Sequence, residues 1–260
     1  GTEALQMDLY AEMRGRIKEE DVSAAVRRGP YLYYHRTEQD KQYSVQCRKR
    51  LRVDPDEMRH NPEILPTDLF CQPEEIVLDE NKEAEGSEYY RATGCSVAPT
   101  KHEIVVYGED RVGDEMYTLR FRALGEANPA FAEAPIPKCS GQVAWASDDD
   151  QTLFYITKNK LDRPDKVWRH RMGTTPDKDQ LIFEEVDELY CVDVERSDSG
   201  DFVFVTSTSS ETTKGFFVNA RDPSGRPRRI LPITKGVEYQ VFDRNGLLYL
   251  VTNADGATNF

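Results

Sequence analysis

Long apolar runs are missing from this 260-residue sequence. No stretch of 18 apolar residues occurs, so no membrane-spanning helix is expected, and the N-terminus lacks the apolar core of a signal peptide. Mean hydropathy is low at −0.69, yet the chain contains 13 Tyr, 11 Phe and 2 Trp that can build a core. Plentiful aromatics in a polar chain favour short, half-buried strands over disorder.

Basic residues are in the minority. The chain has 34 Lys and Arg against 47 Asp and Glu, which gives a formal net charge of −13. Because phosphate contacts need a basic patch, we expect no nucleic-acid surface. An acidic chain can attract cationic ligands such as basic peptides, although the same charge can also serve solubility alone.

Cysteines are few and widely spaced. They are Cys47, Cys71, Cys95, Cys139 and Cys191. Their number is odd and no CxxC pair occurs, which argues against a structural zinc site. Reduced thiols in a cytoplasmic protein are the simpler interpretation.

Motifs of the common catalytic sites are also absent. The chain has no G-x-S-x-G elbow, no HExxH helix, no Walker A phosphate loop and no GxGxxG turn. Asp255-Gly256 lacks the flanking acids of a calcium loop and predicts a simple turn. We therefore predict no catalytic, cofactor-binding or metal-binding residue in this chain, and no cofactor.

A repeated hairpin pattern is what the sequence does contain. Tyr107, Tyr155, Val205 and Leu250 hold equivalent places in successive hairpins, at spacings of 48, 50 and 45 residues. A period near ~45 residues with about four strands per repeat is typical of a β-propeller blade. One four-stranded sheet cannot bury both of its faces, whereas blades stacked face to face can. A β-sandwich has no such long period, so we predict an all-β propeller.

The repeats give a blade count. Hairpins are predicted at residues 29–49, 101–124, 150–173, 200–222 and 246–260. Shorter strands are expected between them, at Ile76–Leu78, Leu181–Phe183, Leu189–Val194, Arg229–Leu231 and Glu238–Phe242. The fifth repeat stops part-way, so we expect about four blades and the start of a fifth, within a longer parent protein.

Two segments depart from the strand pattern. Apolar residues at four-residue steps predict a helix over residues 4–20, with an apolar stripe that needs a partner surface. The stripe consists of Leu5, Leu9, Met13 and Ile17, widened by Met7 and Tyr10. Residues 54–75 contain four prolines among acidic residues and predict an irregular excursion of unknown role. The expected division is an N-terminal helical segment at 1–28 and a partial propeller at 29–260.

Several residues are of types that occur in catalytic or metal-binding sites. The four histidines are His35, His60, His102 and His170. A catalytic triad can assemble from distant positions, but without a nucleophile turn we assign structural roles to all four. Asp148–Asp150 could bind a cation, yet it occupies the polar turn of a repeat, so a solvated turn is expected. Trp145 and Trp168 are expected to pack between blades, with partners for their indole N–H groups.

Six segments, in order along nearly the whole chain, carry a family resemblance. They are Glu12–Asp21, Gly29–Lys49, Glu75–Asn81, Gly113–Leu124, Arg163–Gly173 and Gly236–Tyr239. The most specific is Arg163–Gly173, which reads RPDKVWRHRMG. Together they resemble the N-terminal part of oligopeptidase B, the basic-residue-specific branch of the prolyl oligopeptidase family of serine peptidases.

The resemblance implies a seven-bladed propeller that covers an α/β-hydrolase domain with a Ser/Asp/His triad. It implies that the propeller admits only short peptides, that cleavage follows Arg or Lys, and that the N-terminal helical segment packs toward the catalytic domain. None of the matching motifs is catalytic, so no catalytic residue is carried over. The chain alone is predicted to be inactive, with the serine beyond Phe260.

These observations lead to one function and one alternative. The chain is predicted to be the propeller portion of an oligopeptidase B-like serine endopeptidase, which gates and orients short basic peptides. Its partners would be the α/β-hydrolase domain of the same parent chain and the peptide substrate, with no nucleic acid and no membrane. The alternative is a non-enzymatic propeller that binds a protein partner, because the fold alone allows both.

Overall fold

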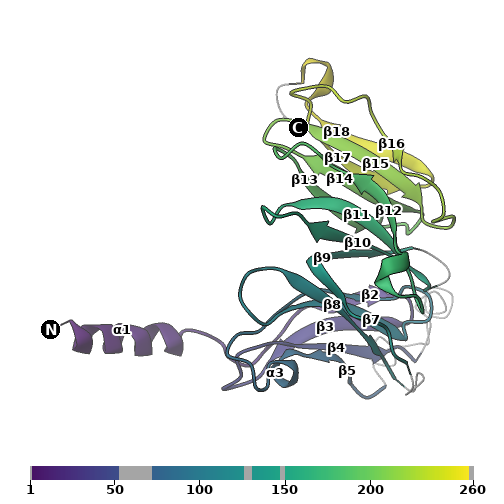
Figure 1. Cartoon of the computed structure of the whole chain (residues 1–260). Coiled ribbons are helices and arrows are strands. Elements are labelled where there is room, and N and C mark those ends of the chain that lie inside the picture. The colour runs from purple at the N-terminus through teal and green to yellow at the C-terminus, as the bar shows by residue number, and fades with distance from the viewer. Residues whose placement is uncertain (1, 53–71, 126–130, 147–149, 258–260) are drawn as a thin grey trace, which may run out of the picture. The chain divides into compact units, whose positions relative to one another are not determined.

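The computed structural model describes residues 2–52, 72–125, 131–146 and 150–257. Strands dominate, accompanied by helix α1 (Glu3–Gly15) and the short helix α3 (Glu80–Glu83) (Figure 1). The chain divides into two compact units, residues 1–86 and 87–260. The prediction of a strand-rich chain with a short N-terminal helix is confirmed. In the described part of the chain, no helix is long and apolar enough to cross a bilayer.

The first unit contains one antiparallel sheet. Its strands are β1 (Asp21–Val22), β2 (Val26–Arg28), β3 (Tyr31–Thr37), β4 (Val45–Arg50) and β5 (Glu75–Asp79), in the order β1-β3-β4-β5 with β2 also paired to β3. The predicted β3–β4 hairpin is confirmed, with Tyr34 opposite Cys47. The sheet contains an ion pair in which the nearly inaccessible Arg48 donates to both carboxylate oxygens of the partly exposed Glu75 at 2.8 Å.

Helix α1 is shorter than the sequence predicts. It ends at Gly15, and the backbone N–H of Arg16 closes its last turn on the Met13 carbonyl. Glycine is a poor helix former, which explains why the helix stops five residues early. The following residues join β3 as β1 and β2, so strands occupy part of the segment predicted to be helical. Most of the predicted excursion, residues 53–71, lies outside the described residues.

The second unit contains the remaining strands. They are β6 (Arg91–Val97), β7 (Ile104–Asp110), β8 (Tyr117–Ala123), β9 (Ile136–Trp145), β10 (Thr152–Lys158), β11 (Pro164–Arg171), β12 (Gln180–Glu184), β13 (Cys191–Arg196), β14 (Phe202–Thr208), β15 (Thr213–Asn219), β16 (Arg228–Arg229), β17 (Tyr239–Arg244) and β18 (Leu247–Thr252). The hairpins β7–β8, β10–β11 and β14–β15 are those that the repeat predicts. Strands β6 and β9 were not predicted.

Strand β9 belongs to two repeats at once. Its first half pairs with β8, where Ile136 lies opposite Leu119, and its second half pairs with β10, where Trp145 lies opposite Leu153. Successive repeats are therefore joined into one seven-stranded sheet. We number the blades accordingly: blade 1 is β1–β5, blade 2 is β6–β8 with the start of β9, blade 3 is the rest of β9 with β10–β12, blade 4 is β13–β16, and blade 5 is β17–β18.

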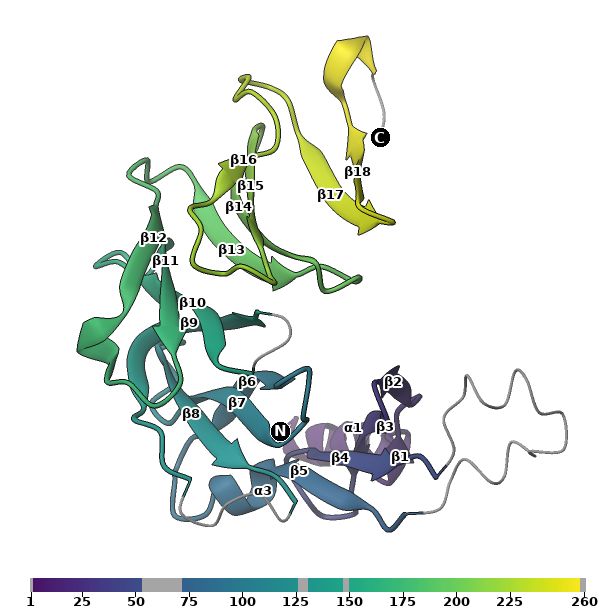
Figure 2. The same ribbon diagram turned by 90° about the vertical axis from the view of Figure 1, so that its right-hand side faces the viewer.

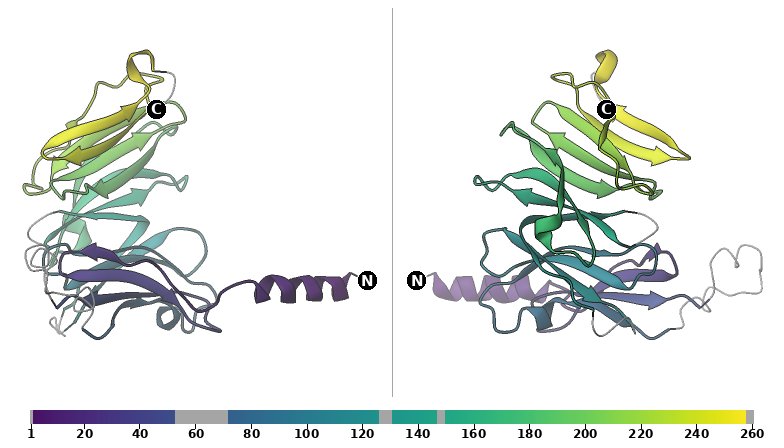
Figure 3. Two further views of the ribbon diagram at one scale, coloured as in Figure 1. Left: turned by 180° about the vertical axis from the view of Figure 1, so that it is seen from behind. Right: turned by 45° about the vertical axis from the view of Figure 1, so that its right-hand side comes forward.

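The blades of the second unit pack face to face (Figure 2, Figure 3). Separate apolar clusters lie between blades 2 and 3, between blades 3 and 4, and between blades 4 and 5. Strand β10 shows why its sequence is continuously apolar. Leu153 and Tyr155 pack toward blade 2, whereas Phe154 and Ile156 pack toward blade 4. Alternate side chains of a strand point to opposite faces, so a strand buried on both faces needs an unbroken apolar run.

Both tryptophans lie at a blade boundary, as predicted. Trp145 and Trp168 belong to the cluster between blades 2 and 3. The Trp145 Nε1–H donates to the Ser96 carbonyl at 3.3 Å, and the Trp168 Nε1–H donates to the Thr157 hydroxyl at 2.9 Å. Each indole therefore contributes a large apolar surface without leaving its N–H unpaired.

Strands β6 and β9 cross at two glycines with positive φ. Gly94 has φ of 62° and Gly141 has φ of 90°. A Cβ atom on Gly94 would lie 2.0 Å from the Gly141 carbonyl oxygen. Since that oxygen belongs to the backbone, it cannot swing aside as a flexible side chain could, and the crossing requires glycine.

Substitution of Gly94 by alanine is predicted to destabilise the second unit. The clash and the positive φ together should lower the free energy of unfolding by at least about 2 kcal/mol. Urea denaturation followed by tryptophan fluorescence measures this, because Trp145 and Trp168 both lie in that unit. Gly15→Ala is the control, since nothing lies within 4 Å of its Cβ position. Equal midpoints for the two variants would contradict the crossing argument.

Candidate functional site

Strand β13, the first strand of blade 4, carries a pair of carboxylates. Val192 and Val194 point into the cluster between blades 3 and 4, which leaves Asp193 and Glu195 on the opposite face. Burial raises the pKa of Asp193, and burial together with the neighbouring charges of Asp193 and Asp198 raises the pKa of Glu195. We call Asp193 and Glu195 the β13 acidic pair. In a propeller the first strand of each blade lies nearest the central channel.

Asp150, in the acidic turn of blade 3, is buried and not solvated as the sequence predicts. Its side chain is buried, and the carboxylate accepts the backbone N–H groups of Thr100 at 2.8 Å and Lys101 at 2.6 Å. Those residues form the turn between β6 and β7, so Asp150 joins blade 3 to blade 2. The sequence prediction is wrong here because the N–H donors that satisfy the buried Asp150 carboxylate come from blade 2. Asp148 and Asp149 lie outside the described residues.

The histidines occupy different environments. His35 is exposed on β3, His102 is buried in the β6–β7 turn with φ of 59°, and His60 lies outside the described residues. His170 on β11 is 0% exposed. A carboxylate lies on each side of the His170 ring.

His170 belongs to a buried polar cluster. Its Nδ1 lies 2.7 Å from Asp179 Oδ1, and its Nε2 lies 3.4 Å from Glu133 Oε1 without the geometry of a hydrogen bond. Asp179 Oδ2 accepts the Tyr155 hydroxyl at 2.8 Å, and Glu133 Oε2 accepts the Gly173 N–H at 2.7 Å. We call His170, Asp179, Glu133 and Tyr155 the His170 cluster. The structural role assigned to His170 stays a prediction.

Sequence reasoning missed the partners of His170. Glu133 comes from the connection between β8 and β9, which shows no apolar periodicity, and Asp179 follows a short 3-10 turn at Pro176–Lys178. The spacing of Glu133, His170 and Asp179 matches no motif. No group of three His, Cys, Asp or Glu side chains that could hold a metal ion occurs within residues 2–52, 72–125, 131–146 and 150–257.

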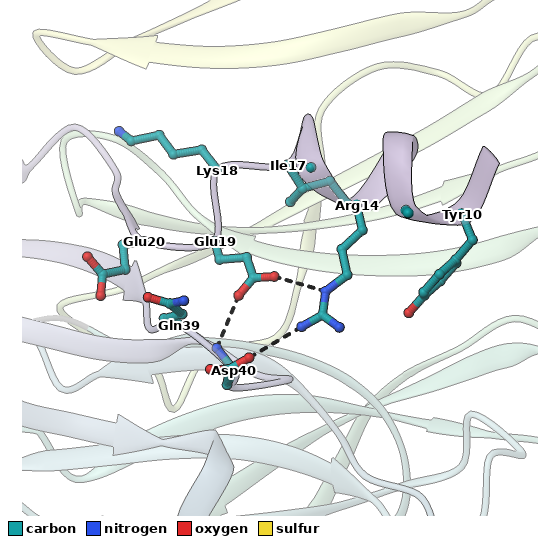
Figure 4. Close-up of a pocket in the computed structure, with 10 residues that line it drawn as sticks. Tyr10, Arg14, Ile17, Lys18, Glu19, Glu20, Gln39 and Asp40 are labelled. Carbon is teal, nitrogen blue, oxygen red and sulfur yellow. Dashed lines mark hydrogen bonds and ion pairs between the residues drawn. The ribbon is translucent and has the colours of Figure 1, made fainter. Parts of the chain in front are cut away.

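An open depression of about 700 Å³ lies where α1 meets the first sheet (Figure 4). Arg14 bridges two carboxylates there, with Nε 3.2 Å from Glu19 and Nη2 3.3 Å from Asp40. The Asp40 backbone N–H also donates to Glu19 at 3.2 Å, and this bond together with Arg14 lowers the pKa of Glu19. Charges of both signs are thus already paired within the depression, which favours a structural connection over a ligand site.

Helix α1 exposes its apolar stripe. The exposed fractions are 60% for Leu5, 49% for Leu9 and 67% for Met13 on the helix, and 66% for Ile17, which lies two residues beyond its end. An exposed row of large apolar side chains on one helix marks an interaction surface. The described residues of the first unit leave this stripe uncovered, in agreement with the expectation that it needs a partner.

Comparison with known proteins decides the family. The profile of the prolyl oligopeptidase N-terminal beta-propeller domain matches residues 1–260. The chain belongs to the prolyl oligopeptidase family. It is 30% identical over 252 residues to "Protease 2" of Moraxella lacunata, covering 97% of this chain and 34% of that protein. The resemblance inferred from six segments is therefore confirmed.

Solved structures of the family agree. Oligopeptidase B from Leishmania major superimposes with a TM-score of 0.83 at 29% identity, covering 97% of this chain and 33% of that one. Oligopeptidase B from Trypanosoma brucei, solved with covalently bound antipain in a closed form, gives 0.80 at 31% identity with the same coverage. The propeller fold is thus confirmed. This member of the prolyl oligopeptidase family spans about a third of the length of the relatives that it matches.

The thiols of this propeller are predicted to react in a defined order. Cys47, Cys139 and Cys191 are free, and only Cys191 of these three is exposed. Burial raises the pKa of Cys47 to about 11 and that of Cys139 to about 12, so neither forms the reactive thiolate near neutral pH. Iodoacetamide labelling with peptide mapping should modify Cys191 first, and the other two only after unfolding. Early labelling of Cys139 would contradict the buried position of β9.

Proposed function

We propose that this chain is the propeller portion of an oligopeptidase B-like serine endopeptidase, which cleaves short peptides after Arg or Lys. The observation that carries the proposal is the match to two oligopeptidase B structures along 97% of the chain. The catalytic domain would correspond to the part of those relatives that this chain does not cover. Within such an enzyme the propeller would exclude folded proteins and orient extended peptides for the serine.

The proposal gives both exposed apolar surfaces a partner. The α1 stripe in the helical segment 1–28 would pack against the α/β-hydrolase domain. On blade 5 of the propeller at 29–260, the outer face of β17–β18 would pack against a further blade. Phe242, Leu247, Tyr249 and Val251 lie on that face and are 41–61% exposed. Burial of such side chains is worth roughly 1.5–3 kcal/mol each, so both surfaces favour association.

Basic substrates suit the charge of the chain. At low salt the net charge of −13 favours the approach of cations, and the β13 acidic pair offers two carboxylates on a first strand. The free thiols of Cys47, Cys139 and Cys191 support a reducing, cytoplasmic location. A non-enzymatic propeller that binds a protein partner is the competing function, and activity measurements separate the two.

The 260-residue chain alone is predicted to leave an Arg-containing fluorogenic peptide intact. Joined to the downstream segment of its own reading frame, it should show turnover that a serine-directed inhibitor abolishes. The physical reason is that the chain has no G-x-S-x-G elbow. Turnover by the chain alone would contradict the prediction that it contains no catalytic residues. A reading frame with no serine elbow downstream, and a stable monodisperse chain, would instead favour the protein-binding propeller.

Neutralising the β13 acidic pair is predicted to weaken the preference for basic peptides. In the complete enzyme, Asp193→Asn or Glu195→Gln should lower kcat/KM for an Arg-rich peptide by roughly two- to tenfold at low salt, with little effect at high salt. The pKa of the half-buried Asp193 is raised by burial, and that of Glu195 by partial burial and the nearby Asp193 and Asp198. The wild-type preference should therefore also fall on mild acidification, at a pH where an unperturbed carboxyl would still be charged.

The control for this experiment is Glu211→Gln, which removes one negative charge from the exposed β14–β15 turn. It changes net charge by the same amount as each test variant. Equal losses in kcat/KM for Glu211→Gln and Glu195→Gln would show that net charge, and not the β13 acidic pair, sets the preference.

A further inference from the structure

One end of the second unit carries exposed apolar side chains. Because antiparallel strands alternate in direction, the turns β7–β8, β10–β11 and β14–β15 lie at the same end as the connections β12–β13 and β16–β17. Most of these segments contain large apolar residues that are 44–84% exposed. We call them the apolar tips: Val112, Leu161, Val186, Leu189 and Ile233.

The opposite end of the second unit is polar. It contains the turns β6–β7, β9–β10, β13–β14 and β17–β18 and the connections β8–β9, β11–β12 and β15–β16. Within the described residues of these segments, no large apolar side chain is exposed to this extent. Asp150 and Ser199 form hydrogen bonds between blades there. Both ends consist of turns, so the fold itself does not require the difference, and exposed apolar side chains concentrated at one end indicate an interaction surface.

Three of the apolar tips are held in place by the same local contact. In each case the backbone N–H of the tip donates to the side chain of the Asp or Asn two residues earlier. The pairs are Val112 with Asp110 at 2.8 Å, Leu161 with Asn159 at 2.8 Å and Leu189 with Asp187 at 3.0 Å. Such a turn fixes the backbone that carries the apolar side chain. A residue that is fixed before binding loses less conformational entropy on binding, so these tips are preorganised for contact.

The path of the chain indicates which partner covers this end. Strands β6, β13 and β17, which begin blades, start at the end with the apolar tips, and the last strands β12 and β16 finish there, at Glu184 and Arg229. A polypeptide that leaves the propeller after a complete blade therefore leaves from this end. The part that this chain covers is about a third of the length of the relatives, so much of each relative lies outside it.

We propose that the apolar tips are the surface on which the α/β-hydrolase domain of the parent protein docks, an inference that rests on the function proposed above. A domain tethered where completed blades end can reach this surface without crossing the propeller. The polar end then faces solvent, and the first strands run from the hydrolase domain toward solvent. On β13 this orientation places Cys191 nearer the hydrolase domain and Glu195 nearer the solvent end.

Hydroxyl-radical footprinting tests the docking surface without any substitution. Oxidation is mapped by peptide in the 260-residue chain and in the complete protein expressed from the same reading frame. Oxidation of Leu161 and Leu189 should fall by roughly fivefold or more in the complete protein, because the core of an interface excludes water. Leu181, an exposed leucine of β12 that is not one of the apolar tips, is the internal control and should be oxidised equally in both proteins.

A double variant tests whether the tips hold the partner. Leu161→Ser combined with Leu189→Ser should leave the urea midpoint of the 260-residue chain unchanged, because both side chains are exposed in it. Each leucine buried at an interface is worth roughly a factor of ten in affinity. In the complete protein the double variant should therefore open the interface and raise the oxidation of Val112 toward its level in the 260-residue chain. Leu181→Ser, the same chemical change elsewhere in the unit, is the matched control and should leave Val112 protected.

Equal oxidation of Leu161 and Leu189 in the two wild-type proteins would overturn the proposal. So would protection in the 260-residue chain that grows with its concentration, because a second copy would then cover the tips. Peptidase activity distinguishes a failure of this proposal from a failure of the proposed function. A complete protein that cleaves the Arg-containing peptide while its tips stay exposed would contradict only the docking surface. Protected tips in a complete protein without peptidase activity would support the docking surface and contradict the function.

Discussion

Burial of both faces of each blade is the constraint on which the second unit depends. A sheet that is apolar on one face can leave the other in water, but β10 is apolar on both, with Leu153 and Tyr155 on one side and Phe154 and Ile156 on the other. At roughly 25 cal/mol for each Å² of apolar surface, neither face can be left exposed without a large loss of stability. Blades must therefore stack, and each needs a neighbour on either side.

Because the stacked faces of the blades are apolar, polar side chains lie in the turns at the strand ends. There they form hydrogen bonds between neighbouring blades. Asp150 of blade 3 accepts two N–H groups from the turn of blade 2, and Asp243 of blade 5 accepts the Ser199 hydroxyl from the turn of blade 4. Glu133 reaches from blade 2 to the N–H of Gly173 in blade 3. Apolar clusters hold the blades together non-directionally, and these bonds fix how each blade is aligned with the next.

The parts of this architecture that were predictable are those with local sequence signals. Period and alternation locate the hairpins, because β10 and β11 are neighbours in the chain and each carries its own apolar pattern. Strands β6 and β9 could not be predicted because Gly94 and Gly141 interrupt their sequence patterns. Each glycine is required by the close approach of the other strand. The partners of His170 were likewise hidden, since Glu133 is separated from it by 37 residues of chain and the contact exists only after blades 2 and 3 stack. The burial of Asp150 was hidden for the same reason. An acidic turn is expected to be solvated, and Asp150 is buried only because it contacts the neighbouring blade.

Net charge and local charge have different meanings in such a structure. The total of −13 does not tell where the charges lie, and exposed charges further apart than roughly 8 Å are largely screened at physiological salt. Carboxylates that burial removes from water act over longer distances, because the surrounding dielectric constant is lower. The half-buried Asp193 meets that condition on a first strand, with the exposed Glu195 two residues further on, whereas Asp150, Asp179 and Glu133 already accept hydrogen bonds between and within blades. The contacts of each carboxylate, and not the total of 47 acidic residues, therefore decide whether it remains available to a cationic ligand.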